Sequence, residues 1–343
     1  MKIVIPVFGF GKSGGERVLS KLSSELVKIG CYVYFVTLKS SEEIYYKTDA
    51  EIVFCNCSTK KNKVLKFLNN NYLLYKKCKE LKPDCIIANF HLTAFLVFLL
   101  PRSIRKYYYI QAYEVVFYKS IIRKLIALIT YCLPIKKIIN HRDLLPKILN
   151  NHIGIIPAGI DQTIFYPRNY SGVKKNIGVV GRKEIHKGTK NIIDALINWE
   201  QKHLITFNIA LYLSKDDEVK LKEHDVDYNF YPIYDDIQLA KFYRVNDLVI
   251  ATGLVEDGAF HYPCAEAMSC GCAVISNYAP LADTNSTLKI PTFTVENLIN
   301  RLNYYMDMSD EEIFSEIKMN FSHVKEHDWE IVGRNFYEII KNN

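Results

Sequence analysis

The sequence predicts two doubly wound α/β domains, each a parallel β-sheet with helices on both faces. Short apolar runs alternate with helical patterns through both halves of the 343-residue chain. The runs are continuous rather than alternating between apolar and polar residues, as strands covered on both faces require. No segment of 20–50 residues repeats, which argues against solenoids and propellers.

Twelve apolar runs are expected to form strands. They lie at residues 2–8, 31–37, 51–56, 84–89, 107–111, 137–140 and 154–156 in the first half, and at 176–181, 206–213, 228–233, 247–252 and 273–277 in the second. Helical patterns lie between them, and the first has an apolar face that ends at Gly30. The alternation therefore predicts βα units in both halves.

The boundary between the domains is expected within residues 157–170, where prolines, glycines and polar residues interrupt the alternation. We expect an N-terminal domain over 1–165 and a second domain over 166–325. The stretch from Asp310 onward is predicted to be helical without strands, and its pattern allows packing on either domain.

Composition excludes several classes of protein. Hydrophobic residues make up 49% of the chain and charged residues 24%, which excludes intrinsic disorder. The longest apolar stretch, Leu92 to Leu100, is far shorter than the roughly 20 residues of a spanning helix. The nine cysteines contain no CxxC pair, and no secretory signal is recognised, so we expect a reducing cytoplasm.

The net charge of +7 is unevenly distributed. Residues 1–165 carry 25 Lys and Arg against 11 Asp and Glu, whereas residues 166–343 carry 19 against 26. A basic half suggests an anionic partner. Nucleic acid is not expected, because no helix-turn-helix, RNA-recognition or zinc pattern accompanies the charge.

A glycine-rich segment, Gly9 to Val18, joins the first strand to the first helix. It is not a nucleotide-hydrolysing P-loop, because Pro6 stands where the first glycine is required. The dinucleotide pattern Gly9-x-Gly11-x-x-Gly14 is weak, because no acid ends the second strand to hold a ribose. We favour an anion or substrate loop over a simple tight turn.

Two further segments follow predicted strands of the second half. In 181–196, Arg182 and Lys187 precede a helix and would form a diphosphate clamp, although a solvated lysine-rich turn is the slightly favoured alternative on this segment alone. In 255–277, a helix is expected near Pro263, with Glu266 in its first turn. Its carboxylate would accept hydrogen bonds from a ribose, and the N–H groups of His261 to Cys264 would face a phosphate. The alternative is that Glu266 only complements the helix dipole.

Lone histidines and a short acidic motif complete the candidates. His91, His141 and His261 have no carboxylate partner at a recognisable spacing and are expected to be structural, although His91, directly after a strand, is the best placed for acid–base work. Asp225-Val226-Asp227 has the form of a metal-binding DxD, but we interpret it as a loop.

Taken together, five segments in order resemble retaining glycosyltransferase family 4, which has the GT-B fold. Residues 14–37 are similar to its opening Gly-Gly-x-Glu helix, and 155–167 to its Asn-Gly-Ile-Asp linker, with Ala158 for the asparagine. Residues 181–196 are similar to its Arg and Lys-Gly donor clamp, 260–277 to its Glu-Ala-Met block, and 327–340 to its closing helix. Bacterial O-antigen and capsule glycosyltransferases have this form.

The resemblance implies two Rossmann-like domains that face each other across a cleft holding a nucleotide sugar. It implies that residues 326–343 form a helix that crosses back to the first domain. On the donor side, Gly14 and Gly15 would approach the phosphates or sugar, Arg182 and Lys187 would neutralise the leaving diphosphate, and Glu266 would hold the ribose. The backbone of Phe260, His261 and Tyr262 would lie near the diphosphate, and Tyr231 to Ile233 would frame the base.

The sequence departs from the family at two positions. The family's first glutamate, which contacts the donor hexose, falls at Gly258; Asp257 would replace it, and Glu256 lies two positions away. A histidine that often ends the fifth strand is replaced by Gln111, followed by Glu114. Glutamine cannot act as a base, so either His91 takes part on the acceptor side with these residues or no protein base does.

The resemblance implies a retaining, metal-independent hexosyltransferase without a cofactor. The acceptor would be a glycan, with a polyprenyl-diphosphate-linked form expected by analogy. Basic and apolar residues at 117–126 and 133–137 suit an anionic membrane surface, which would place the protein peripherally on the cytoplasmic face of the inner membrane; ordinary packing with a solvated basic face is equally compatible. A sugar-nucleotide epimerase of GT-B fold, a nicotinamide oxidoreductase and a non-catalytic glycan- or membrane-binding protein remain as alternatives.

Overall fold

A computed structural model describes the chain except residues 12, 42–43, 143, 171, 173 and 256. The chain divides into two compact units: unit 1 comprises Met1–Gly159 with Trp329–Asn343, and unit 2 comprises Ile160–Asp328. The boundaries expected from the sequence, at 165/166 and 325/326, lie a few residues from these. None of the described helices is long and apolar enough to cross a membrane.

Unit 1 contains a seven-stranded sheet in the order β3-β2-β1-β4-β5-β6-β7. Every pair of neighbours is parallel, and Ile3 of the central β1 faces both Val33 of β2 and Cys85 of β4. The strands are β1 (Lys2–Pro6), β2 (Tyr32–Leu38), β3 (Glu51–Cys55), β4 (Cys85–Ala88), β5 (Arg105–Ile110), β6 (Lys136–Ile139) and β7 (Gly154–Ile155). Each coincides with one of the apolar runs predicted in the first half.

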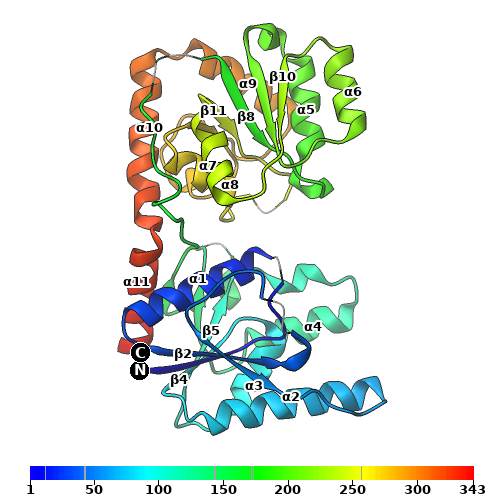
Figure 1. Ribbon diagram of the computed structural model, residues 1–343, viewed down its shortest axis with the longest axis vertical. Coiled ribbons are helices and arrows are strands. Elements are labelled where there is room, and N and C mark those ends of the chain that lie inside the picture. The colour runs from blue at the N-terminus through cyan, green and yellow to red at the C-terminus, as the bar shows by residue number, and fades with distance from the viewer. Residues whose placement is uncertain (12, 42–43, 143, 171, 173, 256) are drawn as a thin grey trace. The chain divides into compact units, whose positions relative to one another are not determined.

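Helices cover both faces of this sheet. On one face α1 (Gly14–Lys28) lies beside α11 (Trp329–Asn342), so closely that a Cβ on Gly333 would stand 2.4 Å from the Cβ of Glu25 (Figure 1). On the other face are α2 (Lys63–Glu80), α3 (His91–Leu99) and α4 (Ile121–Thr130), with α3 in contact with both of its neighbours. Their shared core includes Val4, Leu74, Ala94 and Tyr131.

Unit 2 contains a five-stranded sheet in the order β10-β9-β8-β11-β12, again with every pair parallel. Its strands are β8 (Asn176–Val180), β9 (Thr206–Ala210), β10 (Tyr228–Tyr231), β11 (Leu248–Ile250) and β12 (Ala273–Ile275). These five match the runs predicted in the second half. The prediction of two doubly wound α/β domains is confirmed.

Two cores flank the sheet of unit 2. One face packs against α5 (Thr189–Asn198), α6 (Lys215–Glu223), α9 (Val295–Asp307) and α10 (Asp310–Val324). The other packs against α7 (Asp236–Arg244) and α8 (Tyr262–Ser269). Short 3-10 helices include η2 (Glu114–Phe117) in unit 1 and η4 (Ile185–Lys187) in unit 2.

Strand order reverses direction once in each sheet, between β1 and β4 in unit 1 and between β8 and β11 in unit 2. In open parallel sheets the loops after such a pair of strands leave toward opposite faces, and ligands bind in the crevice between them. The loops concerned follow Pro6 and Ala88 in unit 1, and Val180 and Ile250 in unit 2. The glycine-rich segment and the segments 181–196 and 255–277 each follow one of these strands.

We predict that Gly181→Ala destabilises unit 2. A Cβ at Gly181 would stand 1.8 Å from the carbonyl oxygen of Tyr212, so the backbone must move, at a cost of about 1–3 kcal/mol or more. Urea unfolding would measure the loss. Gly15→Ala is the control, because its Cβ would meet Gln111 at an ordinary 3.6 Å and alanine favours a helix. Equal stability of the two variants would contradict the steric argument.

Candidate functional site

The loop from β8 to α5 holds Arg182 and Lys187 in place through its backbone. The Thr189 hydroxyl accepts a hydrogen bond from the Arg182 N–H at 2.8 Å and donates to the Arg182 carbonyl oxygen at 3.0 Å. Lys187 ends η4, and Gly188 follows with a φ of 73°, a conformation that suits glycine. Both cations therefore stand between the end of a central strand and the start of α5.

Neither cation is neutralised within the described part of the chain. Arg182 and Lys187 are half-buried, and neither side chain makes an ion pair or hydrogen bond with a described residue. Burial, followed by the charges of Lys187 and Arg182, lowers the pKa of His261 to about 3. The three side chains are therefore close enough to interact electrostatically, and His261 is a neutral imidazole at physiological pH.

Glu266 lies on α8. It is 1% exposed, and its carboxylate accepts a hydrogen bond from the Tyr243 hydroxyl at 3.1 Å. Burial and the Glu266 charge raise the pKa of Tyr243, while the Arg182 charge opposes this shift. The helix begins at Tyr262, so Glu266 lies in its second turn; the expectation of a first-turn position was wrong, and complementing the helix dipole does not account for the residue.

Phe260, His261 and Tyr262 form the entry to α8. Phe260 pairs with Ala279 in an isolated parallel bridge, and its ring lies 5.3 Å from that of Tyr262. The His261 N–H donates to the Ala279 carbonyl oxygen at 2.9 Å, so it does not point to a phosphate as expected. This bridge anchors the loop and leaves the start of α8, where Pro263 has no N–H, as the candidate anion position.

Asp257 and Ile233 complete the predicted residues of unit 2. Both carboxylate oxygens of Asp257 are held, one by the Asn277 side-chain amide at 2.5 Å and one by the Thr292 hydroxyl at 3.1 Å. Ile233 and Tyr231 pack against the same core as Phe260 and Tyr262, so they share one face with the entry to α8. Glu256 lies outside the described residues.

In unit 1, Gly14 and Gly15 open α1. The Glu16 carboxylate accepts from the N–H of Gly11 at 2.8 Å and of Ser13 at 3.0 Å, closing a capping box. The N–H groups of Gly14 and Gly15 receive no acceptor from the described residues. An anion at this helix would therefore meet those two amides, while the chain's own carboxylate occupies the preceding ones.

Gln111 lies directly against Gly15. Its side-chain amide donates to the Gly15 carbonyl oxygen at 3.2 Å, and the Asn140 amide donates to the Gln111 carbonyl oxygen at 2.8 Å. The structure thus places a predicted acceptor-side residue next to a predicted donor-side residue.

His91 and Glu114 form a buried pair, each 3% exposed. One Glu114 carboxylate oxygen accepts from the His91 N–H at 2.8 Å and faces His91 Nδ1 at 2.6 Å; the other accepts from the Tyr108 hydroxyl at 2.8 Å. The expectation that His91 lacks a carboxylate partner was therefore wrong. Glu114 follows β5, the strand that pairs with β4, and the spacing of residues along the sequence does not show that these two strands are neighbours.

The far side of the imidazole is covered by Tyr118. Its hydroxyl lies 3.3 Å from His91 Nε2, and burial followed by the Glu114 charge raises its pKa. With Nδ1–H donated to Glu114, Nε2 accepts a proton donor at this position. Tyr118 was missed in the sequence because nothing in its local pattern distinguishes it.

The acidic motif Asp225-Val226-Asp227 lies away from these residues. It immediately precedes β10, at the amino end of the strand, and Asp227 accepts from the Thr206 hydroxyl at 2.5 Å. Its interpretation as a loop is confirmed. Within the described residues no group of three or more His, Cys, Asp and Glu could hold a metal ion.

No family model matches the sequence, and no curated protein matches it. Solved structures do match. Sucrose-phosphate synthase from Thermosynechococcus elongatus has a TM-score of 0.76 at 16% identity, over 99% of this chain and 98% of that one. HepE from Anabaena in complex with UDP-glucose has a TM-score of 0.71 at 14% identity, over 100% of each chain.

The lipopolysaccharide outer core galactosyltransferase WaaB, in its apo form, has a TM-score of 0.73 at 15% identity, over 100% of this chain and 99% of that one. At these identities the similarity is one of fold. The chain has the GT-B fold that the five segments implied.

Proposed function

We propose that the protein is a retaining, metal-independent glycosyltransferase that moves a hexose from a nucleotide sugar to a glycan acceptor. The main supporting observation is that two unpaired cations, Arg182 and Lys187, and the buried Glu266 all follow the strands at the strand-order reversal of unit 2. The chain shares its fold with HepE, whose solved complexes hold UDP, glucose and UDP-glucose.

Each predicted residue has a distinct task in this reaction. Arg182 and Lys187 would stabilise the negative charge that develops on the leaving diphosphate, which is the largest catalytic contribution expected in such a site. Glu266 would accept the ribose hydroxyls, and Ile233 would border the base. The N–H groups of Gly14 and Gly15 would meet the phosphates or sugar.

The glutamate that contacts the donor hexose in the family is absent from this chain, because Gly258 stands at its position. Asp257 is the nearest described carboxylate to that position in sequence, and Asn277 and Thr292 fix its orientation. We propose that it contacts the hexose. Proton NMR of the product's anomeric configuration would test retention, and an inverted product would contradict it.

Donor binding is tested by thermal unfolding with UDP-, GDP- and dTDP-sugars. Ligand at about 100 times its Kd should stabilise the protein by about 2.7 kcal/mol, with one nucleotide class only. Arg182→Ala, Lys187→Ala and Glu266→Ala should abolish this gain. Lys318→Ala, an exposed lysine of α10, makes the same charge change elsewhere in unit 2 and should keep the gain.

If one nucleotide sugar stabilised the protein and all four variants kept that stabilisation, the assignment of Arg182, Lys187 and Glu266 to the donor site would be contradicted. Stabilisation without transfer to any acceptor, together with conversion of the donor sugar, would favour the sugar-nucleotide epimerase. No stabilisation by any nucleotide sugar would favour a non-catalytic glycan- or membrane-binding protein.

The acceptor side is proposed to rest on His91, Glu114 and Gln111. The Tyr118 hydroxyl already shows where His91 Nε2 holds a hydroxyl group. An acceptor hydroxyl that displaced Tyr118 would find the same nitrogen, in the tautomer set by Glu114. As the new C–O bond forms and the C–O bond to the phosphate breaks, the hydroxyl proton would pass to His91 Nε2, and the phosphate would leave as an anion stabilised by Arg182 and Lys187.

His91→Gln should therefore lower sugar transfer about 100-fold while leaving nucleotide-dependent stabilisation unchanged, because a misplaced acceptor loses the near-attack geometry. Transfer would be measured with a labelled donor and membrane vesicles as the acceptor source. Tyr118→Phe is the control, because it removes only the hydroxyl that the acceptor replaces. Unchanged transfer in His91→Gln would contradict the assignment.

An anionic membrane surface is proposed as a partner of unit 1, at the cytoplasmic face of the inner membrane, with a polyprenyl-diphosphate-linked glycan of surface polysaccharide synthesis as the acceptor. The apolar stripe of α4 faces solvent: Ile121 is 74% and Ile122 71% exposed, and Leu125 and Ile129 continue the stripe. The exposed cations Lys119, Arg123 and Lys124 flank it. Apolar side chains bordered by cations on one helix are typical of interfacial binding.

Replacing Ile122 by Asp should lower partitioning onto phosphatidylglycerol vesicles at least tenfold, because a buried isoleucine contributes about 1.5–3 kcal/mol. Sedimentation with the vesicles would measure it. Val219→Asp, at an exposed valine of α6 in unit 2, should leave partitioning unchanged. Equal partitioning of both variants and the wild type would contradict the assignment of α4.

A further inference from the structure

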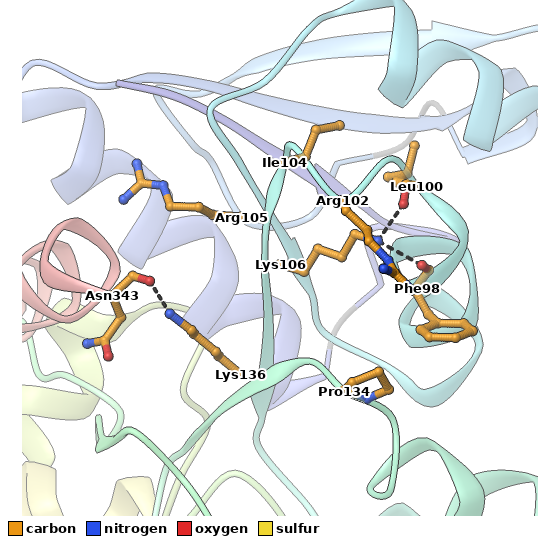
Figure 2. A pocket seen from close by; sticks show the side chains of 9 residues that line it. All are labelled: Phe98, Leu100, Arg102, Ile104, Arg105, Lys106, Pro134, Lys136 and Asn343. Atoms are coloured by element: carbon orange, nitrogen blue, oxygen red, sulfur yellow. Dashed lines mark hydrogen bonds between the residues drawn. The ribbon is translucent and has the colours of Figure 1, made fainter.

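A pocket at the amino edge of the unit 1 sheet is lined by four cations. It has a volume of about 520 Å³, and it lies where β5 and β6 begin, at the edge opposite the candidate acceptor site. Arg102, Arg105, Lys106 and Lys136 contribute the charges (Figure 2). No carboxylate side chain is among its lining residues.

Backbone carbonyls are the acceptors for three of these cations. Arg105 donates to the Ile340 carbonyl oxygen at 2.8 Å. Figure 2 shows Lys136 donating to the main-chain oxygen of Asn343 and Lys106 donating to the Phe98 carbonyl oxygen, the latter at 2.8 Å. The carbonyls belong to the C-terminal ends of α11 and α3. Arg102 donates no hydrogen bond to a described residue.

These partners do not balance the charge. Lys106 donates to carbonyl oxygens at the C-terminal end of α3. A helix C-terminus carries about half a negative elementary charge, so it offsets only part of the charge of Lys106 and none of the charge of Arg102. No described residue makes an ion pair with Arg102 or Lys106. Burial lowers the pKa of Lys106, and the neighbouring charge of Arg102 lowers it further. A bound anion would relieve this repulsion.

Apolar residues form the rest of the wall. Phe98, Leu100, Ile104 and Pro134 line the pocket, and Leu99 beside it is 67% exposed. A hydrophilic anion alone would gain nothing from these side chains, whereas an anion that carries an apolar group would bury them. The lining therefore combines anion recognition with an apolar contact.

We propose that this pocket binds a phosphate ester, with its anionic group between Arg102 and Lys106 and its organic part on the apolar wall. The site is separate from the proposed donor and acceptor residues, and it does not depend on the glycosyltransferase assignment. A lipid phosphate and a water-soluble phosphate share this chemistry, and the experiment distinguishes them.

The test titrates the full chain calorimetrically with inorganic pyrophosphate and with dihexanoyl phosphatidic acid below its micelle concentration. The background variant carries Arg182→Ala and Lys187→Ala, so that the cations of unit 2 contribute no binding. Both probes should bind, and adding Arg102→Gln and Lys106→Gln should weaken binding at least tenfold, since each removes a charge-assisted contact.

Lys215→Gln with Lys318→Gln is the matched control, because it removes the same charge from exposed positions of unit 2. Tighter binding of the lipid than of pyrophosphate, lost in Phe98→Ser, would identify a lipid phosphate. Similar binding of both probes would identify a soluble phosphate. Absence of binding, or equal weakening by the control pair, would overturn the site, and neither result would bear on the donor assay.

Discussion

The reversal of strand order in each sheet is the constraint on which the rest of the structure depends. Where two parallel strands send their connections to opposite faces, no helix covers the point between them, and backbone amides stay accessible there. Gly14 and His91 follow one such pair of strands, and Arg182 and Glu266 follow the other. Two sheets of different size thus place their chemistry by the same geometric rule.

Some buried charges among the described residues have hydrogen-bond and ion-pair partners that stabilise the fold, and others have none. The Asp247 carboxylate binds Arg168 at 2.7 Å and also accepts from the N–H groups of Lys175 and Asn176. Glu114 is equally well supplied with donors. Burying a charge is costly unless partners replace its water, and these partners do so. Arg182 and Lys187 are partly withdrawn from water without that compensation, which is the physical argument for an anionic ligand.

Fold class was readable from the sequence because strands buried on both faces must be continuously apolar. All twelve predicted runs are strands in the described chain. The pairing of side chains from different strands could not be predicted in the same way. His91 and Glu114 are 23 residues apart, and only the adjacency of β4 and β5 brings them together.

The position of Glu266 shows a different limit. A start of α8 near Pro263 placed it in the first turn, whereas the helix begins at Tyr262, and this small shift removes it from the helix end. The pocket at the amino edge of the unit 1 sheet could not be predicted from the sequence for a third reason. Its cations come from the turn before β5 and from the starts of β5 and β6, and only the pairing of these two strands brings Lys136 to Arg105 and Lys106.

The membership of α11 in unit 1 has a consequence for biosynthesis. Val332, Phe336 and Ile340 are buried, and the Tyr107 hydroxyl donates to the Ile340 carbonyl oxygen, so α11 completes the face that α1 begins. All seven strands of that sheet leave the ribosome before this helix is made. At about 5–20 residues per second, the apolar surface waits on the order of 10–30 s for its cover. Unit 2 is continuous in sequence and is complete before α11 is made, so the sheet of unit 1 is closed only after unit 2 has been synthesised.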